Sequence, residues 1–197
     1  MAQAATSRSA SLHRDDWLNA ALSRLSDQGI EAVRVEVLAR DLGVSKGSFY
    51  WHFRDRGDLL DTMLSHWEAS ERDWLDMSPT YETAATRWAR VVARTANPGH
   101  IRLEAAVRTW ARRDERVARR VAALERRKAG LIAGVLRDVG FTRAAAEAWA
   151  EVVLLVCLGW LDRAARDRDF ELASRGLGDV LSEVILAASA GSTVLKR

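Results

Sequence analysis

The residues best suited to chemistry in this sequence lie between positions 45 and 52. They include the cation Lys46, the hydroxyl groups of Ser48 and Tyr50, the indole of Trp51 and the imidazole of His52. Cationic and hydroxyl groups donate hydrogen bonds to phosphate oxygens and to the edges of bases. A helix that presents these groups on one side is predicted to contact nucleic acid.

The surrounding residues predict how that helix is held. Phe49 and Phe53 are spaced i and i+4, so both should face a core and leave their neighbours outside. Gly43 can take the left-handed conformation that ends a preceding helix, and Ser45 is expected to cap the next one. Ala39 is small enough for the two helices to cross closely. This pattern predicts a helix-turn-helix.

The same segment resembles a known family. The run from Arg34 to Phe53, followed by Asp55-Arg56 and Leu59-Leu60, resembles the N-terminal domain of the tetracycline-repressor (TetR) family. The resemblance extends from about Asp15 to Leu64 and implies double-stranded DNA as a partner. The residues that it places toward DNA are Ser45, Lys46, Gly47, Ser48, Tyr50, Trp51, His52 and Arg56. Many members carry Thr where this chain has Arg34 and Val35, so these two join the DNA-binding candidates, with Arg34 as a phosphate contact.

Composition sets the broad class. The chain has 197 residues, 48% of them hydrophobic, with only 2 prolines and 1 cysteine. These values favour an all-α globular protein in a reducing compartment. Residues 1–11 lack an apolar run of signal-peptide length, and residues 148–161 are too short for a membrane span. We therefore expect a soluble cytoplasmic protein with no membrane partner.

Charge by itself is a weak argument for DNA binding. The net charge is only +3. Residues 1–56 contain 8 Lys and Arg against 7 Asp and Glu, whereas residues 102–143 contain 12 against 5. The interpretation therefore depends on the placement of Lys46, Arg54 and Arg56, and not on bulk charge.

Periodicity and capping residues predict about nine helices. The fold expected is a three-helix helix-turn-helix domain followed by a larger helical domain for ligand binding and dimerisation. The expected helices span residues 14–28, 35–42, 46–53, 56–75, a fifth beginning after a Thr80 cap, 101–112, a seventh capped by Asp114, 143–166, and a last one over 177–188. The expected regions are an arm at 1–13, the DNA-binding domain at 14–56, the effector and dimerisation domain at 57–190 and a tail at 191–197.

The second domain is expected to carry two further sites. The whole chain has 8 tryptophans. Those in the second domain indicate either a core of large residues or a hollow suited to an apolar ligand. The TetR resemblance favours a small-molecule effector, and the candidate pocket residues are Trp67, Glu71, Trp88, Arg108 and Trp110. Helix 143–166 is apolar around almost its whole circumference, which predicts a homodimer. The candidate interface residues are Val153, Leu154, Leu161 and Leu181.

The sequence offers little for catalysis. It has no phosphate-binding loop and no Gly-x-Ser-x-Gly elbow, and its 4 histidines lack metal-ligand spacing with Cys157. We therefore expect no enzyme activity, no cofactor and no metal. The hypothesis is a ligand-responsive repressor that binds a palindromic operator as a dimer. The alternatives are a helical scaffold or interaction protein that uses its aromatic C-terminal domain for a protein partner and, less favoured, a helical-bundle enzyme.

Overall fold

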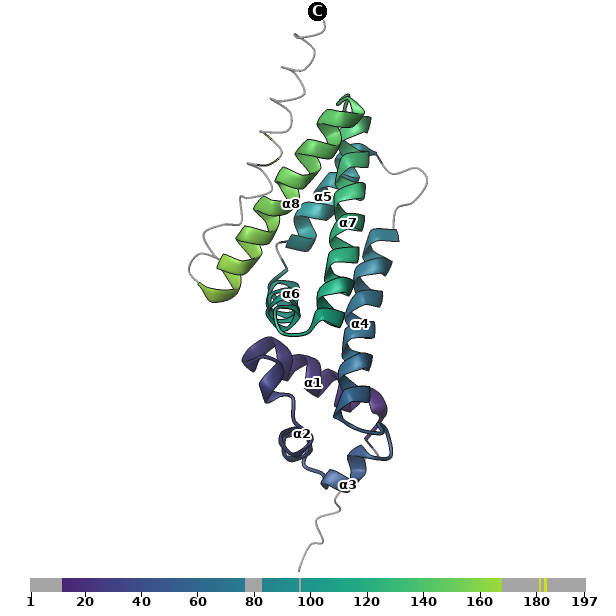
Figure 1. The fold of residues 1–197 in the computed structure, drawn as a ribbon, viewed down its shortest axis with the longest axis vertical. Helices are drawn as coiled ribbons and strands as arrows, with labels where there is room; N and C mark the ends of the chain where they lie inside the picture. Colours follow the sequence, from purple (N-terminus) through teal and green to yellow (C-terminus); the bar gives the residue numbers. More distant parts are fainter. Residues whose placement is uncertain (1–11, 77–82, 96, 168–180, 182, 184–197) are drawn as a thin grey trace, which may run out of the picture. The chain divides into compact units, whose positions relative to one another are not determined.

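The computed structural model describes residues 12–76, 83–95, 97–167, 181 and 183, and the regular structure within them is helical (Figure 1). Eight α-helices and one 3-10 helix occur over these residues. In chain order they are α1 (Arg14–Gln28), η1 (Ile30–Ala32), α2 (Val35–Asp41), α3 (Lys46–Phe49), α4 (Arg56–Asp76), α5 (Ala84–Thr95), α6 (Pro98–Ala111), α7 (Glu115–Asp138) and α8 (Arg143–Arg166).

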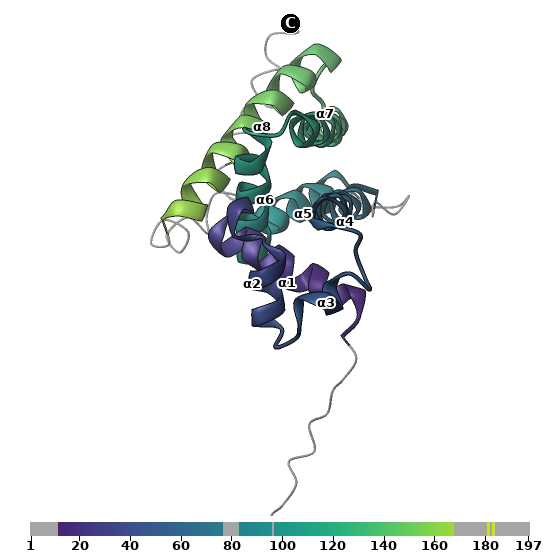
Figure 2. The same cartoon turned by 60° about the horizontal axis from the view of Figure 1, so that its bottom comes forward.

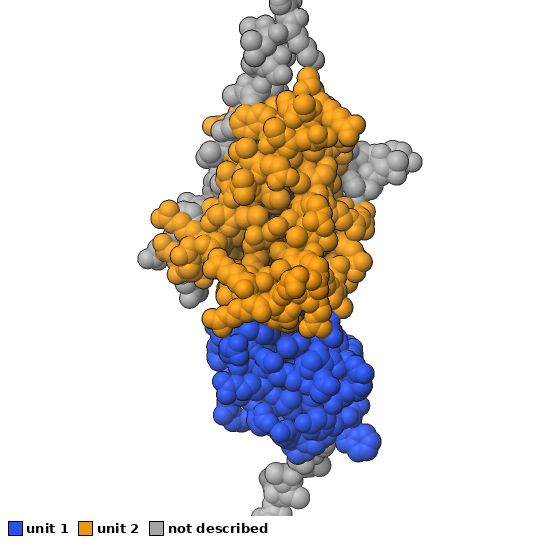
Figure 3. All heavy atoms as spheres, in the orientation of Figure 1, with its two compact units in different colours: residues 1–64 blue, residues 65–197 orange. Residues whose placement is uncertain are grey.

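The chain divides into two compact units, residues 1–64 and residues 65–197 (Figure 3). The division falls inside α4, and the domain bounds expected from the sequence stay a prediction. The first unit therefore includes the opening turns of this long helix.

The core of the first unit is built around aromatic rings. Trp17 and Phe49 are fully buried, and Phe53 is 1% exposed. The Trp17 and Phe49 rings meet edge to face with centroids 5.3 Å apart, and Phe49 stacks on Phe53 at 5.4 Å. Such ring geometry adds to the stabilisation from burial alone. This core joins α1 to α3, two of the helices that Figure 2 shows grouped in this unit.

The corner between α2 and α3 forms as expected. Gly43 has a φ of 69°, its N–H donates to the Arg40 carbonyl, and the Val44 N–H donates to the Ala39 carbonyl. This pair of bonds is the Schellman arrangement, which satisfies the last carbonyls of a helix. A side chain at position 43 would be strained by the positive φ, so glycine fixes the turn.

The third helix is shorter than the expected 46–53. It is α-helical only over Lys46–Phe49, after which the N–H groups of Tyr50, Trp51 and His52 bond three residues back. The expected Ser45 cap is also wrong, since the Ser45 side chain makes no capping hydrogen bond. The Phe53 N–H still donates to the Phe49 carbonyl, which keeps both rings on the buried side.

The start of α4 is capped as expected. The Asp55 carboxylate accepts a hydrogen bond from the Asp58 N–H, and the Asp58 carboxylate accepts one from the Arg54 N–H. This reciprocal pair satisfies free donors at the helix N-terminus.

In the second unit, α7 and α8 lie side by side (Figure 1) and form its main core. Gly140, with φ 105°, ends α7, and the Thr142 side chain caps α8 by accepting from the Ala145 N–H. The residues of this core are Ala129, Ile132, Ala133, Leu136, Phe141, Ala146, Ala150, Val153, Leu154 and Cys157.

The rotation of α8 differs from the sequence expectation. Val153, Leu154 and Leu161 are 2%, 7% and 3% exposed within one chain, and Leu181 packs against the same core. Val153, Leu154 and Leu161 are already buried in the protomer and Leu181 is partly buried, so the first three are not available to a dimer interface. When a helix is apolar around its whole circumference, its sequence does not indicate which side faces the core.

The other side of α8 carries an exposed apolar stripe. Val152, Leu155 and Val156 are 46%, 67% and 40% exposed. Ala148 and Gly159 extend the stripe along the helix. By length and composition alone α8 could cross a membrane, but a core helix meets the same criterion, and this one has eight residues buried against its own unit.

Several expectations concern other parts of the chain. The arm at 1–11, the Thr80 cap, most of the expected helix at 177–188 and the tail lie outside the described residues. In the described part, α5 begins after Thr83, whose hydroxyl accepts from the Thr86 N–H.

Candidate nucleic-acid interface and buried ionic network

The first candidate site is the exposed side of the α3 segment. Tyr50 is 55% exposed and Trp51 is 88% exposed, while Phe49 between Ser48 and Tyr50 is fully buried. Lys46 and Gly47 are exposed, and Ser48 and His52 are half-buried. Apart from the buried Phe49, the residues from Lys46 to His52 are thus at least partly accessible, and their contact with DNA stays a prediction.

Lys46 is held by an acidic neighbour on α2. Its Nζ forms an ion pair with Glu36, and both side chains are more than half exposed. The hydrogen bond from Lys46 lowers the pKa of Glu36, and the Glu36 carboxylate raises the pKa of Lys46. A phosphate that binds Lys46 would therefore compete with Glu36 for the same ammonium group.

Three other predicted DNA-binding residues have different surroundings. Val35 is buried at 7% exposure, so its side chain belongs to the core. Arg34 is exposed, and its Nε donates to the Glu31 carbonyl at 2.9 Å. Arg56 donates to the carbonyls of Val33 and Ile30, at 2.6 and 2.9 Å. Through these hydrogen bonds Arg56 links α4 to the residues around η1.

The second candidate site is a network of charges inside the second unit. Glu71 on α4 and Glu104 on α6 are each 1% exposed. The Lys128 ammonium on α7 lies 2.8 Å from one oxygen of Glu71 and 3.1 Å from one of Glu104. The Trp67 indole N–H donates to the other Glu104 oxygen at 3.2 Å. Buried carboxylates are stable only when paired in this way.

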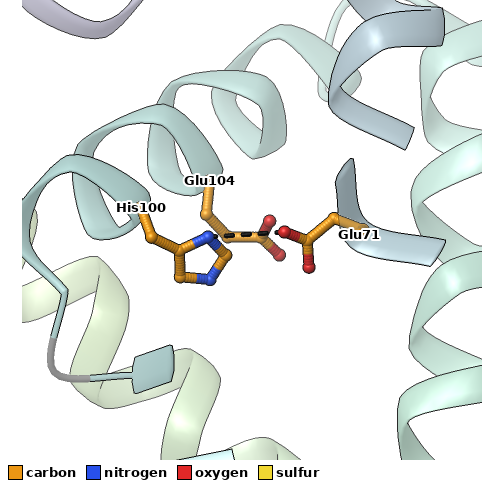
Figure 4. A group of neighbouring side chains, drawn as sticks. All are labelled: Glu71, His100 and Glu104. Carbon is orange, nitrogen blue, oxygen red and sulfur yellow. Dashed lines mark ion pairs between the residues drawn. The ribbon is translucent and has the colours of Figure 1, made fainter. Parts of the chain in front are cut away.

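Two further cationic or titratable groups complete the network. Arg94 on α5 forms an ion pair with Glu71, and the His100 Nδ1 lies 3.4 Å from the same carboxylate. Figure 4 shows His100 and Glu104 projecting from one helix toward Glu71. Ligand atoms of Glu71, His100 and Glu104 lie within 4.8 Å of one another, a spacing that could hold a metal ion. The Lys128 ammonium already supplies positive charge between the two carboxylates.

The charges set the protonation states of the network. Burial alone would raise the pKa of Glu71, but Lys128 and the other positive neighbours outweigh burial and lower it. Burial would lower the pKa of Lys128, but Glu104 and Glu71 raise it. Burial, Arg94 and Lys128 together lower the pKa of His100 by more than Glu71 and Glu104 raise it. The lowered pKa favours the neutral imidazole at neutral pH.

Glu104 was not singled out from the sequence, although its position carried a signal. Glu71 falls at the helical spacing of the apolar residues Trp67 and Leu75, and Glu104 at that of Ile101 and Val107. An ionisable residue on the buried face of a helix needs a partner, and the partners lie on other helices.

The second unit also contains a cavity and a groove. The cavity, of about 40 Å³, is lined by Trp74, Val91, Arg94, His100, Lys128, Leu131, Ile132, Leu154, Cys157, Leu158 and Leu161. The groove, of about 360 Å³, is lined by Ala105, Arg108, Thr109, Ala111, Arg112, Ala118, Val121, Ala122, Glu125, Leu158 and Asp162.

The five residues expected in the effector pocket are distributed around these features. Glu71 belongs to the buried ionic network, and the Trp67 indole N–H donates to Glu104 of the same network. Arg108 lines the groove and pairs with Glu125. Trp88 packs against the α7–α8 core, and Trp110 is 4% exposed.

Comparison with known proteins places the first unit in a family. The family model described as "Bacterial regulatory proteins, tetR family" matches residues 18–63. The chain is 32% identical over 77 residues to the HTH-type transcriptional regulator AcrR of Shigella flexneri, and the aligned region covers 39% of this chain and 34% of AcrR. It is 34% identical over 68 residues to the tetracycline repressor protein class C of Escherichia coli, and that aligned region covers 32% of this chain and 31% of the repressor. The matches span about a third of the length of these curated relatives.

The likeness to solved structures extends over both units. A transcriptional regulator from Rhodococcus sp. RHA1 aligns with a TM-score of 0.72 and 17% identity, over 90% of this chain and 97% of that one. A protein from Saccharomonospora viridis, described as a transcriptional regulator in complex with choline, aligns with a TM-score of 0.73 and 20% identity, over 87% and 94%. At these identities the likeness supports the fold.

Proposed function

We propose, since the chain belongs to the tetR family of bacterial regulatory proteins, that it is a cytoplasmic transcriptional regulator that binds an operator as a homodimer and responds to a small-molecule effector. Repression is the direction of control that we favour. The observation that carries the proposal is the α3 segment, where Tyr50 and Trp51 are exposed although the rings of Phe49 and Phe53 beside them are buried.

The phenol of Tyr50 and the indole of Trp51 follow the short α3 helix and lie largely outside the core. Tyr50 contacts Phe49 edge to face at 5.3 Å, which fixes its ring and leaves the hydroxyl free to reach a phosphate. Lys46 provides the cation on the same segment. In a helix-turn-helix the second helix enters the major groove, and its first residues meet the base edges.

Changing Tyr50 to Phe should weaken operator binding about tenfold or more, because a hydrogen bond to a charged phosphate contributes about 1.5–3 kcal/mol. The ring contact with Phe49 is retained, so thermal stability should not change. Changing Lys46 to Gln should lower the slope of log affinity against log salt by about 1. Fluorescence anisotropy with a labelled duplex measures both quantities.

Gln28→Ala, at the exposed end of α1, is the control for these two substitutions. It should bind the duplex as wild type does. Wild-type affinity in both Tyr50→Phe and Lys46→Gln would place the DNA-binding surface elsewhere in the chain.

The operator itself can be found by selecting bound duplexes from a random pool. A near-palindrome is expected, because two recognition segments related by a two-fold axis read half-sites about 34–36 Å apart, or a multiple of that spacing. Failure to enrich any duplex at low salt would favour the scaffold alternative.

The proposed dimer uses the exposed stripe of α8. A soluble chain rarely leaves a row of large apolar side chains such as Val152, Leu155 and Val156 open to water. A second copy of α8 across a two-fold axis would cover the stripe with an identical one.

Changing Leu155 to Glu should shift the protein from dimer to monomer at micromolar concentration, because it places a charge at the centre of the stripe. Sedimentation equilibrium gives the dissociation constant. Val139→Glu is the matched control, since Val139 is an exposed apolar residue at the end of α7 (37% exposed). A Leu155→Glu dimer as tight as wild type would remove α8 from the proposed interface.

The proposed switch depends on α4, which is one continuous helix from Arg56 to Asp76. It carries Arg56 in the first unit and Glu71 in the buried network of the second. An effector that binds more tightly to one orientation of this helix must, by linkage, change the affinity for DNA. A coupling of about 1–3 kcal/mol would give about 5–150-fold induction.

A further inference from the structure

The 40 Å³ cavity of the second unit is lined in part by side chains that carry hydrogen-bond donors. Its lining is mostly aliphatic, drawn from α5, α7 and α8. Apart from the Cys157 thiol, whose pKa burial raises to about 11, the polar side chains of the lining carry nitrogen groups. They are Trp74, Arg94, His100 and Lys128.

The acidic groups of this region pair with the cations and do not line the cavity. Glu71 and Glu104 are absent from the cavity lining, and Lys128 pairs with both. Arg94 also pairs with Glu71, and its buried Nε has no hydrogen-bond acceptor in the described part of the chain. A cation in the cavity would meet an ammonium and a guanidinium, whereas an anion would meet donors.

The cavity in this state is too small for an organic effector. A volume of about 40 Å³ is close to the share of one water molecule in the liquid, about 30 Å³. Ligand pockets usually enclose about 300–1,000 Å³. An effector must therefore enlarge the cavity.

Leu158 of α8 shows where the extra space could come from. It lines both the cavity and the 360 Å³ groove, so it lies between them. The groove is lined by apolar residues such as Ala105, Val121 and Ala122 and by the charged residues Arg108, Arg112, Glu125 and Asp162. A rotation of the Leu158 side chain would join the cavity to this groove.

From this arrangement we propose that the effector is an organic acid: a carboxylate on an apolar chain, with the carboxylate at Arg94 and Lys128 and the chain passing Leu158 into the groove. The inference rests on the proposed function, because it names the ligand class of that effector site.

The test uses three probes of equal chain length, namely octanoate, octanol and octyltrimethylammonium, and isothermal titration of the full chain. Octanoate should bind at least tenfold more tightly than the other two. Equal binding of the three probes, or a preference for the cation, would overturn the proposal, as would Zn²⁺ binding that is lost in His100→Gln and blocks octanoate.

Two variants locate the site. Arg94→Gln should weaken octanoate binding about tenfold or more, through loss of a charge-assisted hydrogen bond. Leu158→Trp should block the passage between the cavity and the groove and weaken octanoate binding. It leaves the ionic network unchanged, so it tests the location even if Arg94→Gln misfolds. Arg126→Gln, at an exposed position of α7, is the control. Unchanged octanoate affinity in Leu158→Trp would overturn the location.

Operator binding by the same preparations separates the two hypotheses. A protein that binds its selected duplex but prefers the cationic or neutral probe keeps the proposed function and loses the acidic effector. A protein that binds no duplex loses the proposed function, whichever probe it prefers.

Discussion

Replacing Lys128 with Met should lower the unfolding free energy of the second unit by about 3–5 kcal/mol. The substitution removes the ammonium that lies 2.8 Å from Glu71 and 3.1 Å from Glu104, and both carboxylates are 1% exposed. Glu71 would then keep Arg94 as a charged partner, but Glu104 would lose the ammonium that pairs with it. Urea unfolding followed by circular dichroism measures the loss.

A compensating variant tests whether charge is the cause. Adding Glu71→Gln and Glu104→Gln to Lys128→Met removes the unpaired charges, and most of the lost stability should return, because neutral replacements of buried ion pairs are often well tolerated. Arg119→Gln is the control, since its pair with Glu115 is exposed and should contribute less than about 1 kcal/mol.

The pH dependence of the unfolding free energy provides a further test. In wild type the pKa of Glu71 is lowered, so its stabilising contribution is lost as pH falls. In Lys128→Met the pKa of Glu71 should rise, because its burial is no longer offset by the ammonium, so stability should increase as pH falls from about 7 to about 5. A Lys128→Met protein with wild-type stability, or with no such reversal, would show that the network does not hold the buried charges as described.

Local signals in the sequence were sufficient for most helix ends. Gly43 and Gly140 have positive φ values that other residues rarely adopt, and Asp55 and Thr142 cap the helices that follow them. Each signal acts within a few residues of its own position. The bounds of α1 and α8 therefore agree with the sequence expectation.

The features that the sequence did not reveal depend on distant residues or on helix rotation. Lys128 meets Glu71 and Glu104 only because three helices converge. In α8 the apolar residues surround the helix, so nothing local distinguishes buried Leu154 from exposed Leu155. The extent of α3 was also missed, because the Phe49–Phe53 spacing fits both a full helix and a tighter turn.

Replacing Phe53 with Ala should cost the first unit about 3–5 kcal/mol, which is a large part of the stability of a small domain. Phe53 is 1% exposed, its ring stacks on Phe49 at 5.4 Å, and the guanidinium of Arg14 lies 4.6 Å from the ring centre. The substitution therefore leaves a cavity and removes a stacking and a cation–π contact together.

The neighbouring Trp51 provides the matched control for this loss. Trp51→Ala removes a larger ring only two positions away, but that ring is 88% exposed, so unfolding should change by less than about 0.5 kcal/mol. Thermal and urea unfolding of the full chain give both values. Operator binding should show the reverse order at a temperature where both variants are folded, because Trp51 belongs to the proposed DNA surface and Phe53 supports it from behind. Similar stability losses in the two variants would contradict the division of this segment into a buried and a DNA-facing side, on which the proposed function depends.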